Sequence, residues 1–191
     1  MALPSSSETP RTRHLQDIVE AAAAEDVSNW PMLNTKDYEL IGAYIVLFSY
    51  IEFNIRRVVE LFDEKGMLEP PWKGKAPDLR TSDLAAAVQS LECWEEKGRK
   101  ALEEVEELRK FRNLAAHFAV RRFPNKDAFL FVAKSKRDYR RVFGEDPPPG
   151  AALTSVVDCA QIRGALKHVE HVQNWLATAT ANLERHLDSQ P

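Results

Sequence analysis

Residues 40–51 read LIGAYIVLFSYI and form the most apolar stretch of the chain. Charged and polar residues follow at once, whereas a membrane-spanning helix needs about 20 apolar residues. We therefore expect a buried core helix and no membrane span. Asn34 or Thr35 can cap its start, and Gly66 can supply a left-handed stop. These signals predict a first core helix over residues 36–65.

Three further helices are expected after this first core helix in the sequence. Capping and loop residues place them at about 83–97, at about 99–120 after Gly98, and after Asp158 at the C-terminal end. Between the last two, residues 127–143 contain the short aromatic runs AFLFVA and DYRRVF, which predict a β-hairpin. The sequence thus predicts an all-α four-helix bundle with a small β-hairpin inserted before the last helix.

Length and composition set the domain organisation. A chain of 191 residues with 44% hydrophobic and 29% charged residues fits one globular domain. Residues 1–34 lack the apolar core of a secretory signal and are expected to be a tail, with a short helix that could form over 13–25. The helical domain then covers residues 35–188. Cys93 and Cys159 make neither a disulfide framework nor a zinc site, so a cytoplasmic protein is expected.

The end of the third predicted helix, RKFRNLAAHF over residues 109–118, brings together polar residues of catalytic type. Asn113 and His117 are four residues apart and share a helix face. Arg112 is turned by about 140° from His117, a gap that its long side chain can partly bridge. Imidazole can move a proton near neutral pH, and guanidinium can neutralise phosphate charge. These three residues suit phosphodiester chemistry without a metal or a cofactor.

A purely structural role is the alternative for these residues. A histidine in the last helical turn can complement the helix dipole, and an arginine stem can cover apolar surface. The last predicted helix repeats the spacing from Arg163 to His168, with glycine where Asn113 stands. Spacing alone therefore does not identify a site. His168 and His171 with Glu170 could hold a metal, but the neighbouring sequence supplies no further ligands.

The motif R-N-L-A-A-H, late in the third helix of a predicted four-helix bundle, resembles the HEPN (higher eukaryote and prokaryote nucleotide-binding) superfamily. That signature is an arginine, four to six residues and a histidine, usually with a polar residue after the arginine. The match includes Arg112, Asn113 and His117, and the bundle is expected over residues 36–187. Phe118 and Ala119 follow His117, whereas one toxin branch of the superfamily has His-x-Tyr.

The resemblance implies a metal-independent endoribonuclease that acts as a dimer in toxin, phage-defence or CRISPR-associated settings. His117 would act as general base or acid on the ribose 2′-hydroxyl and the leaving 5′-oxygen. Arg112 would stabilise the phosphorane, and Asn113 would orient one of these groups or the phosphate. The products would be a 2′,3′-cyclic phosphate and a 5′-hydroxyl. An antitoxin or a defence-system protein is an expected partner, and a catalytically inactive module that binds RNA, a nucleotide or a protein is the alternative.

A basic segment follows the motif. Residues 121–143 carry eight basic and two acidic side chains, a net charge of +6 in a chain whose formal net charge is −3. Aromatic residues between the charges fit a path for RNA. The alternative is a solvated hairpin whose edges are protected by lysine and arginine. The expected RNA-binding residues are Arg121, Arg122, Lys134, Lys136, Arg137, Arg140 and Arg141.

The first predicted helix carries a carboxylate, Glu52, within its apolar run, and it has more apolar surface than one core buries. Glu52 shares a stripe with Ser49 and Arg56, so it is either a structural carboxylate paired to an arginine or a supporting group that faces Arg112. Apolar residues also cover more of this helix than one core buries, and Ala116 would permit close approach near the motif. We therefore expect a homodimer that brings two motifs together. Coverage by the N-terminal helix is the alternative.

Overall fold

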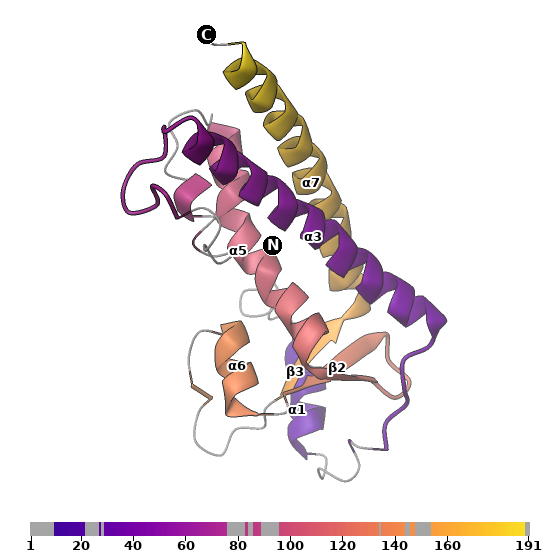
Figure 1. Cartoon of the computed structure of the whole chain (residues 1–191). Helices are drawn as coiled ribbons and strands as arrows, with labels where there is room; N and C mark the ends of the chain where they lie inside the picture. The colour runs from indigo at the N-terminus through magenta and orange to yellow at the C-terminus, as the bar shows by residue number, and fades with distance from the viewer. Residues whose placement is uncertain are drawn as a thin grey trace. The chain divides into compact units, whose positions relative to one another are not determined.

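The computed structural model describes residues 10–21, 27, 29–75, 83, 86–88, 96–133, 135–143, 146–147 and 154–189. The protein is mostly helical and carries a small antiparallel sheet before its last helix (Figure 1). Two compact units are distinguished. The first unit combines residues 1–45 with 107–167, and the second unit combines residues 46–106 with 168–191.

Long helices precede and follow the strands along the chain, and the short helix α6 lies between β2 and β3. The bounds are α1 Pro10–Ala21, α3 Thr35–Glu64, α5 Glu96–His117, β1 Ala119–Arg122, β2 Ala128–Val132, α6 Lys136–Phe143, β3 Thr154–Asp158 and α7 Cys159–Asp188. Three long helices, α3, α5 and α7, each contribute one part to the first unit and one part to the second.

The predicted ends of α3 are confirmed. Asn34 Oδ1 accepts a hydrogen bond from the Asp37 N–H at 3.1 Å, and an Asp37 carboxylate oxygen accepts one from the Asn34 N–H at 2.9 Å. This reciprocal pair is a capping box. At the other end Gly66 has φ 68°, and the Met67 N–H donates to the Phe62 carbonyl at 2.8 Å. A left-handed glycine with that bond is the Schellman stop.

By length and mean hydropathy alone, α3 could cross a membrane, and it is the one such helix among the described residues. A core helix of a soluble protein passes the same test. Within the second unit Phe48, Ile51 and Ile55 are fully buried. Arg57 of α3 also pairs with Glu184 of α7 at 2.6 Å. These are the features of a core helix packed against α7.

The central strand of the sheet in the first unit, β2, is buried on both faces. Its strand order is β1-β2-β3, and both pairings are antiparallel. Leu130 of β2 packs in one cluster with Leu15 and Val19 of α1, which lies against this side of the sheet (Figure 1). On the other face the Phe131 ring meets the ring of Phe111 from α5, with centroids 5.8 Å apart. Burial on both sides explains why β2 is apolar throughout.

The predicted hairpin is partly wrong. The AFLFVA run does form a strand, β2, but its partners are β1 and β3. The DYRRVF run belongs to the helix α6. Ser135 Oγ accepts a hydrogen bond from the Asp138 N–H at 3.2 Å, so this pair caps α6, and Val142 buries one face of the helix. The S-x-x-D signal of a helix start outweighed the aromatic character of the run.

The predicted end of the third helix is also corrected. α5 stops at His117 instead of residue 120, because residues 119–122 pair with β2 in the register Ala119 to Val132. Gly98 lies inside α5 and separates nothing.

The other two predicted helices have different outcomes. Of the helix predicted over residues 83–97, residues 83 and 86–88 are helical, and residues 84–85 and 89–95 lie outside the described residues. The cap at Asp158 is confirmed, since its Oδ1 accepts a hydrogen bond from the Ala160 N–H at 2.8 Å and α7 follows directly.

Candidate functional site

The end of α5 rests on an aromatic core in the first unit. Phe111 is fully buried, and its ring meets the Tyr44 ring edge-on at 4.6 Å. The Tyr44 hydroxyl donates a hydrogen bond to the Leu108 carbonyl at 3.0 Å, and burial raises the pKa of this tyrosine. Edge-on rings and a buried hydroxyl with a partner leave α5 little freedom to shift. The core thus fixes the segment that carries the motif.

The motif residues Arg112 and Asn113 are hydrogen-bonded to each other. Arg112 Nη1 donates to Asn113 Oδ1 at 3.1 Å. Asn113 is only 4% exposed, whereas the sequence predicts it on an accessible face with His117. The correction has a physical reason, because a buried amide oxygen is stable where a cationic donor reaches it. Asn113 therefore orients the guanidinium of Arg112, which lies half-buried at the surface.

His117 is the last residue of α5 and is half-buried. The next residue, Phe118, is buried, and its N–H donates to the Leu114 carbonyl at 3.0 Å. β1 begins one residue later. The imidazole therefore sits at a junction between a helix and a strand, where both elements fix the backbone while the ring keeps partial access to solvent.

Arg122, an expected RNA contact, points into the protein. Its guanidinium pairs with Asp37 and, at 2.6 Å, with Asp127, and it lies 5.4 Å from the ring centroid of Phe129. Asp37 is 4% exposed, so this arginine neutralises a buried carboxylate. Arg121 is half-buried beside Met32. Of the two arginines of β1, Arg122 therefore serves the interior, whereas Arg121 contacts the exposed Met32.

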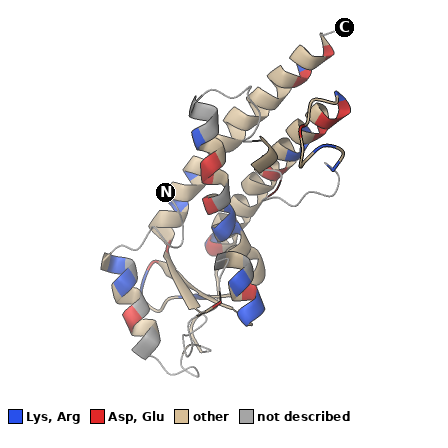
Figure 2. Ribbon diagram, turned by 90° about the vertical axis from the view of Figure 1, so that its left-hand side faces the viewer, with Lys and Arg blue, Asp and Glu red and all other residues tan. Residues whose placement is uncertain are grey.

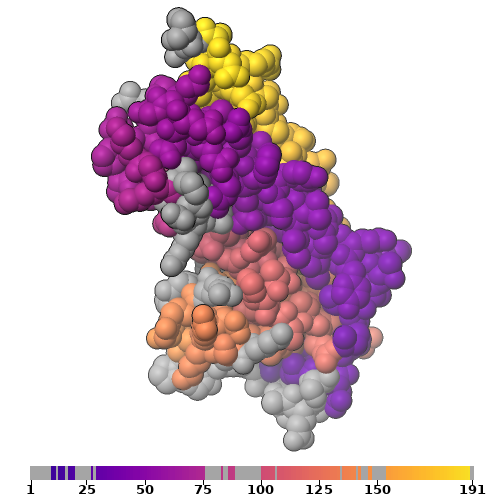
Figure 3. Space-filling view, viewed as in Figure 1, coloured from indigo at the N-terminus to yellow at the C-terminus, as the bar shows by residue number. Residues whose placement is uncertain are grey.

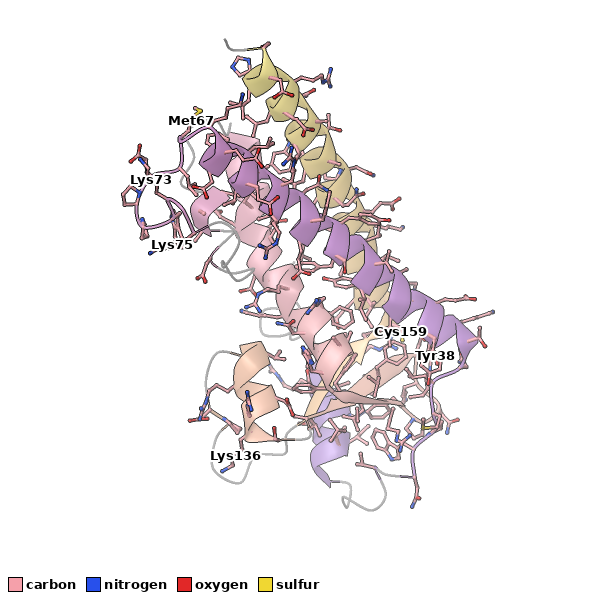
Figure 4. The ribbon with its side chains drawn as sticks, viewed as in Figure 1. Tyr38, Met67, Lys73, Lys75, Lys136 and Cys159 are labelled. Atoms are coloured by element: carbon pink, nitrogen blue, oxygen red, sulfur yellow. The ribbon has the colours of Figure 1, made fainter. Side chains whose placement is uncertain are left out.

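Apart from the exposed Lys126, the exposed positive charge described for residues 121–143 lies on α6. Lys136, Arg137 and Arg140 are exposed, and Figure 2 shows basic residues along this short helix. Lys136 projects outward from the start of α6 (Figure 4). Arg140 Nε bonds the exposed Asp146 at 2.9 Å, which reduces its net contribution. Arg141 belongs to α6, and Lys134 lies outside the described residues.

The two residues of the repeated spacing in α7 contact unrelated carboxylates. Arg163 Nη2 pairs with Asp127 at 2.6 Å in the first unit. His168 Nε2 contacts Glu104 of α5 in the second unit. His171 is exposed. Among the described residues, no three His, Cys, Asp or Glu side chains gather as they would around a metal ion.

One charged cluster was missed by the sequence reasoning, and we call it the Arg122 cluster: Asp37, Arg122, Asp127, Cys159 and Arg163. The hydrogen bond that Asp127 accepts from Arg163 lowers the pKa of the Asp127 carboxyl. Burial raises the pKa of Cys159 to about 12, so this thiol, 3.6 Å from Arg122, is protonated and inert. Asp37 and Arg122 are 85 residues apart in the sequence, so a local sequence pattern does not predict that they pair.

Glu52 is half-buried on α3 and belongs to the second unit, whereas Arg112 and His117 belong to the first. Both readings of this carboxylate, structural and supporting, therefore stay predictions. The candidate site consists of residues of the first unit and does not include Glu52.

Comparison with known proteins gives no further information on this site. No family model matches the chain, and no match is found among curated proteins or among solved structures. The function has to be inferred from the residues themselves.

Proposed function

We propose that this protein is a metal-independent endoribonuclease of the HEPN type, built on a four-helix bundle. The observation that carries the proposal is the hydrogen bond from Arg112 to Asn113. It joins the arginine and the polar residue of the signature into one unit at the end of α5, the same helix that ends with His117. An oriented guanidinium suits a phosphate, because its planar fork of donors matches the geometry of phosphate oxygens.

The chemistry assigned to these residues is transesterification within RNA. As the 2′-oxygen attacks the phosphorus, His117 either removes the 2′-hydroxyl proton while water protonates the leaving 5′-oxygen, or protonates the 5′-oxygen while water accepts the 2′-hydroxyl proton. Arg112 stabilises the negative charge that develops on the phosphorane oxygens. The bond from phosphorus to the 5′-oxygen breaks, which leaves a 2′,3′-cyclic phosphate and a 5′-hydroxyl.

RNA contacts are proposed on α6, which belongs to the same unit as the motif. The exposed positions Lys136, Arg137 and Arg140 supply the charge that a phosphate backbone requires. Arg122 is withdrawn from this set, because two carboxylates already engage it.

A homodimer is proposed on the surface of α3. Val46, Tyr50 and Phe53 are 55%, 53% and 65% exposed, and the surface of α3 is visible in Figure 3. The N-terminal helix α1 packs on the sheet in the first unit, so it has another role. Two copies of α3 packed antiparallel about residue 48 would place Val46 of one copy against Tyr50 of the other, a self-complementary arrangement typical of two-fold dimers.

The dimer is tested by light scattering on Tyr50→Glu, which places a charge against Val46 of the other copy, close to the centre of the proposed contact. The parent should have twice the mass of the variant. Glu60→Gln on the same helix is the control, and it should stay dimeric. A parent that is monomeric at micromolar concentration rejects this interface.

A cytoplasmic toxin or phage-defence effector, with an antitoxin or defence-system protein as partner, is the setting that this proposal favours. The second candidate is a catalytically inactive HEPN-like module that binds RNA. The low exposure of Asn113 favours it, since a buried asparagine that holds an arginine also suits a purely structural helix end.

The decisive experiment is incubation of the protein with total RNA in EDTA, followed by mapping of the cleaved ends. The proposal expects cleavage with 2′,3′-cyclic phosphate ends, lost in His117→Ala at unchanged helicity. Binding without cleavage in both proteins supports the inactive module. Equal cleavage by parent and His117→Ala rejects the proposed site.

A further inference from the structure

The link between His117 and the Arg122 cluster is short. α5 ends at His117, Phe118 forms a bend, and β1 runs from Ala119 to Arg122. Only one residue between the helix end and the strand is outside regular structure. Any displacement of β1 is therefore passed to the backbone of His117.

β1 is an edge strand, and an edge strand has a ladder on one side only. Its pairing with β2 places Arg122 opposite Phe129 at the last position of the ladder. On the other side the Arg122 N–H donates to the Pro31 carbonyl at 2.8 Å. The main chain at Arg122 is thus held from both directions.

The Arg122 side chain adds three more attachments. One arm of the guanidinium pairs with Asp37, next to the cap of α3, and the other pairs with Asp127, in the turn before β2, at 2.6 Å. The plane lies over the Phe129 ring. A forked, planar cation can satisfy two carboxylates and a ring at once, whereas a lysine ammonium cannot.

We infer that Arg122 is a positioning residue for His117: by fixing the free edge of β1 to α3 and to the turn before β2, it sets where α5 ends and where the imidazole lies. This inference rests on the proposed function for its catalytic consequence. General acid-base transfer requires close placement, and a displacement of about 1 Å can cost on the order of 100-fold in rate.

The structure supplies a matched control in Arg163. Both arginines bond the same carboxylate, Asp127, one on each oxygen. Arg163 is more exposed than Arg122, and its ion pair joins α7 to the turn before β2. Arg163→Lys therefore perturbs the same cluster while the attachments of Arg122 to Asp37 and to the Phe129 ring are kept.

The test compares Arg122→Lys with Arg163→Lys at a temperature where both are folded. The ring signals of His117, assigned through His117→Gln among the five histidines, are followed by NMR. Arg122→Lys should shift these signals, and Arg163→Lys should leave them in place. For RNA cleavage, Arg122→Lys should lower kcat by about 10-fold or more with KM within about 2-fold, and Arg163→Lys should change neither beyond about 2-fold.

Several results would overturn the inference. A rise in KM with a smaller salt slope in Arg122→Lys would make this residue an RNA contact. Equal effects of the two substitutions, or unchanged His117 signals, would make the cluster a stabiliser of the fold only. If the parent cleaves no RNA, the proposed function fails while the NMR comparison still decides the positioning role. Should Arg122→Lys not fold, Asp37→Asn, which keeps an acceptor for Arg122, is measured in the same way.

Discussion

The two Arg-to-His spacings of this chain differ in what their residues touch. In α5 the arginine donates a hydrogen bond to Asn113, the polar residue beside it. In α7 Arg163 and His168 each pair with a carboxylate of another element, Asp127 and Glu104. Identical spacing therefore serves a candidate site in one helix and two contacts to distant carboxylates in the other. The partners of Arg163 and His168 give the spacing in α7 a structural role.

The largest expected difference between the Arg-to-His spacings of α5 and α7 is in catalysis. His117→Gln should reduce RNA cleavage by about 100-fold or more, since it removes the proposed proton-transfer group. His168→Gln should stay within about 3-fold, because it removes only an interhelical pair. Single-turnover cleavage of a labelled RNA in EDTA measures both. Similar losses in the two variants would remove the distinction between the two spacings.

The next effect is in RNA binding. Lys136→Gln with Arg137→Gln removes two charges from α6, and should reduce the salt slope of binding by about 1.4 if both contact phosphates of single-stranded RNA. Arg163→Gln with Lys167→Gln removes two charges from α7 and should leave the slope unchanged. Filter binding across a salt series compares the pairs. An equal decrease in both would indicate a general charge effect instead of a path along α6.

A smaller effect concerns the free energy of unfolding at acid pH, through the pair between Arg163 of α7 and Asp127. The pKa of Asp127 is lowered from its ordinary value of 3.8, with Arg163 as the first cause. A lowered carboxyl pKa contributes stability above the unfolded value and loses it as the pH falls through the folded value. Asp127→Asn should thus cost about 1 kcal/mol at pH 7, discounted for its partial exposure, and nothing well below pH 3.8. Urea unfolding at both pH values checks it, with Asp146→Asn as a control expected to change little.

The smallest effect is expected at Glu104. Glu104→Gln should lower the free energy of unfolding by less than about 1 kcal/mol, since Glu104 and His168 are both partly exposed. RNA cleavage should not change. Chemical denaturation and a cleavage assay test these statements together. A loss of activity would show that the Arg-to-His spacing of α7 contributes to the chemistry after all.

Local signals were sufficient where a helix or a cap depends on neighbours in sequence. Asn34 and Gly66 fixed the ends of α3, and Asp158 the start of α7, because caps satisfy backbone groups within a few residues. The same class of signal was present for α6 at Ser135 and Asp138. The aromatic and β-branched residues of the DYRRVF run favour a strand, but this cap decides for a helix.

The amino-acid sequence by itself determined the long apolar helix, its limits, the run that became β2, and the motif of Arg112, Asn113 and His117. Only the tertiary structure decided that residues 119–122 leave the helix to pair with β2, since strand pairing is a contact between distant segments. It also decided that Arg122 faces Asp37 and Asp127 instead of solvent. A charge is read from sequence, but its partner depends on which segments fold against it, and that partner decides whether it can meet a ligand.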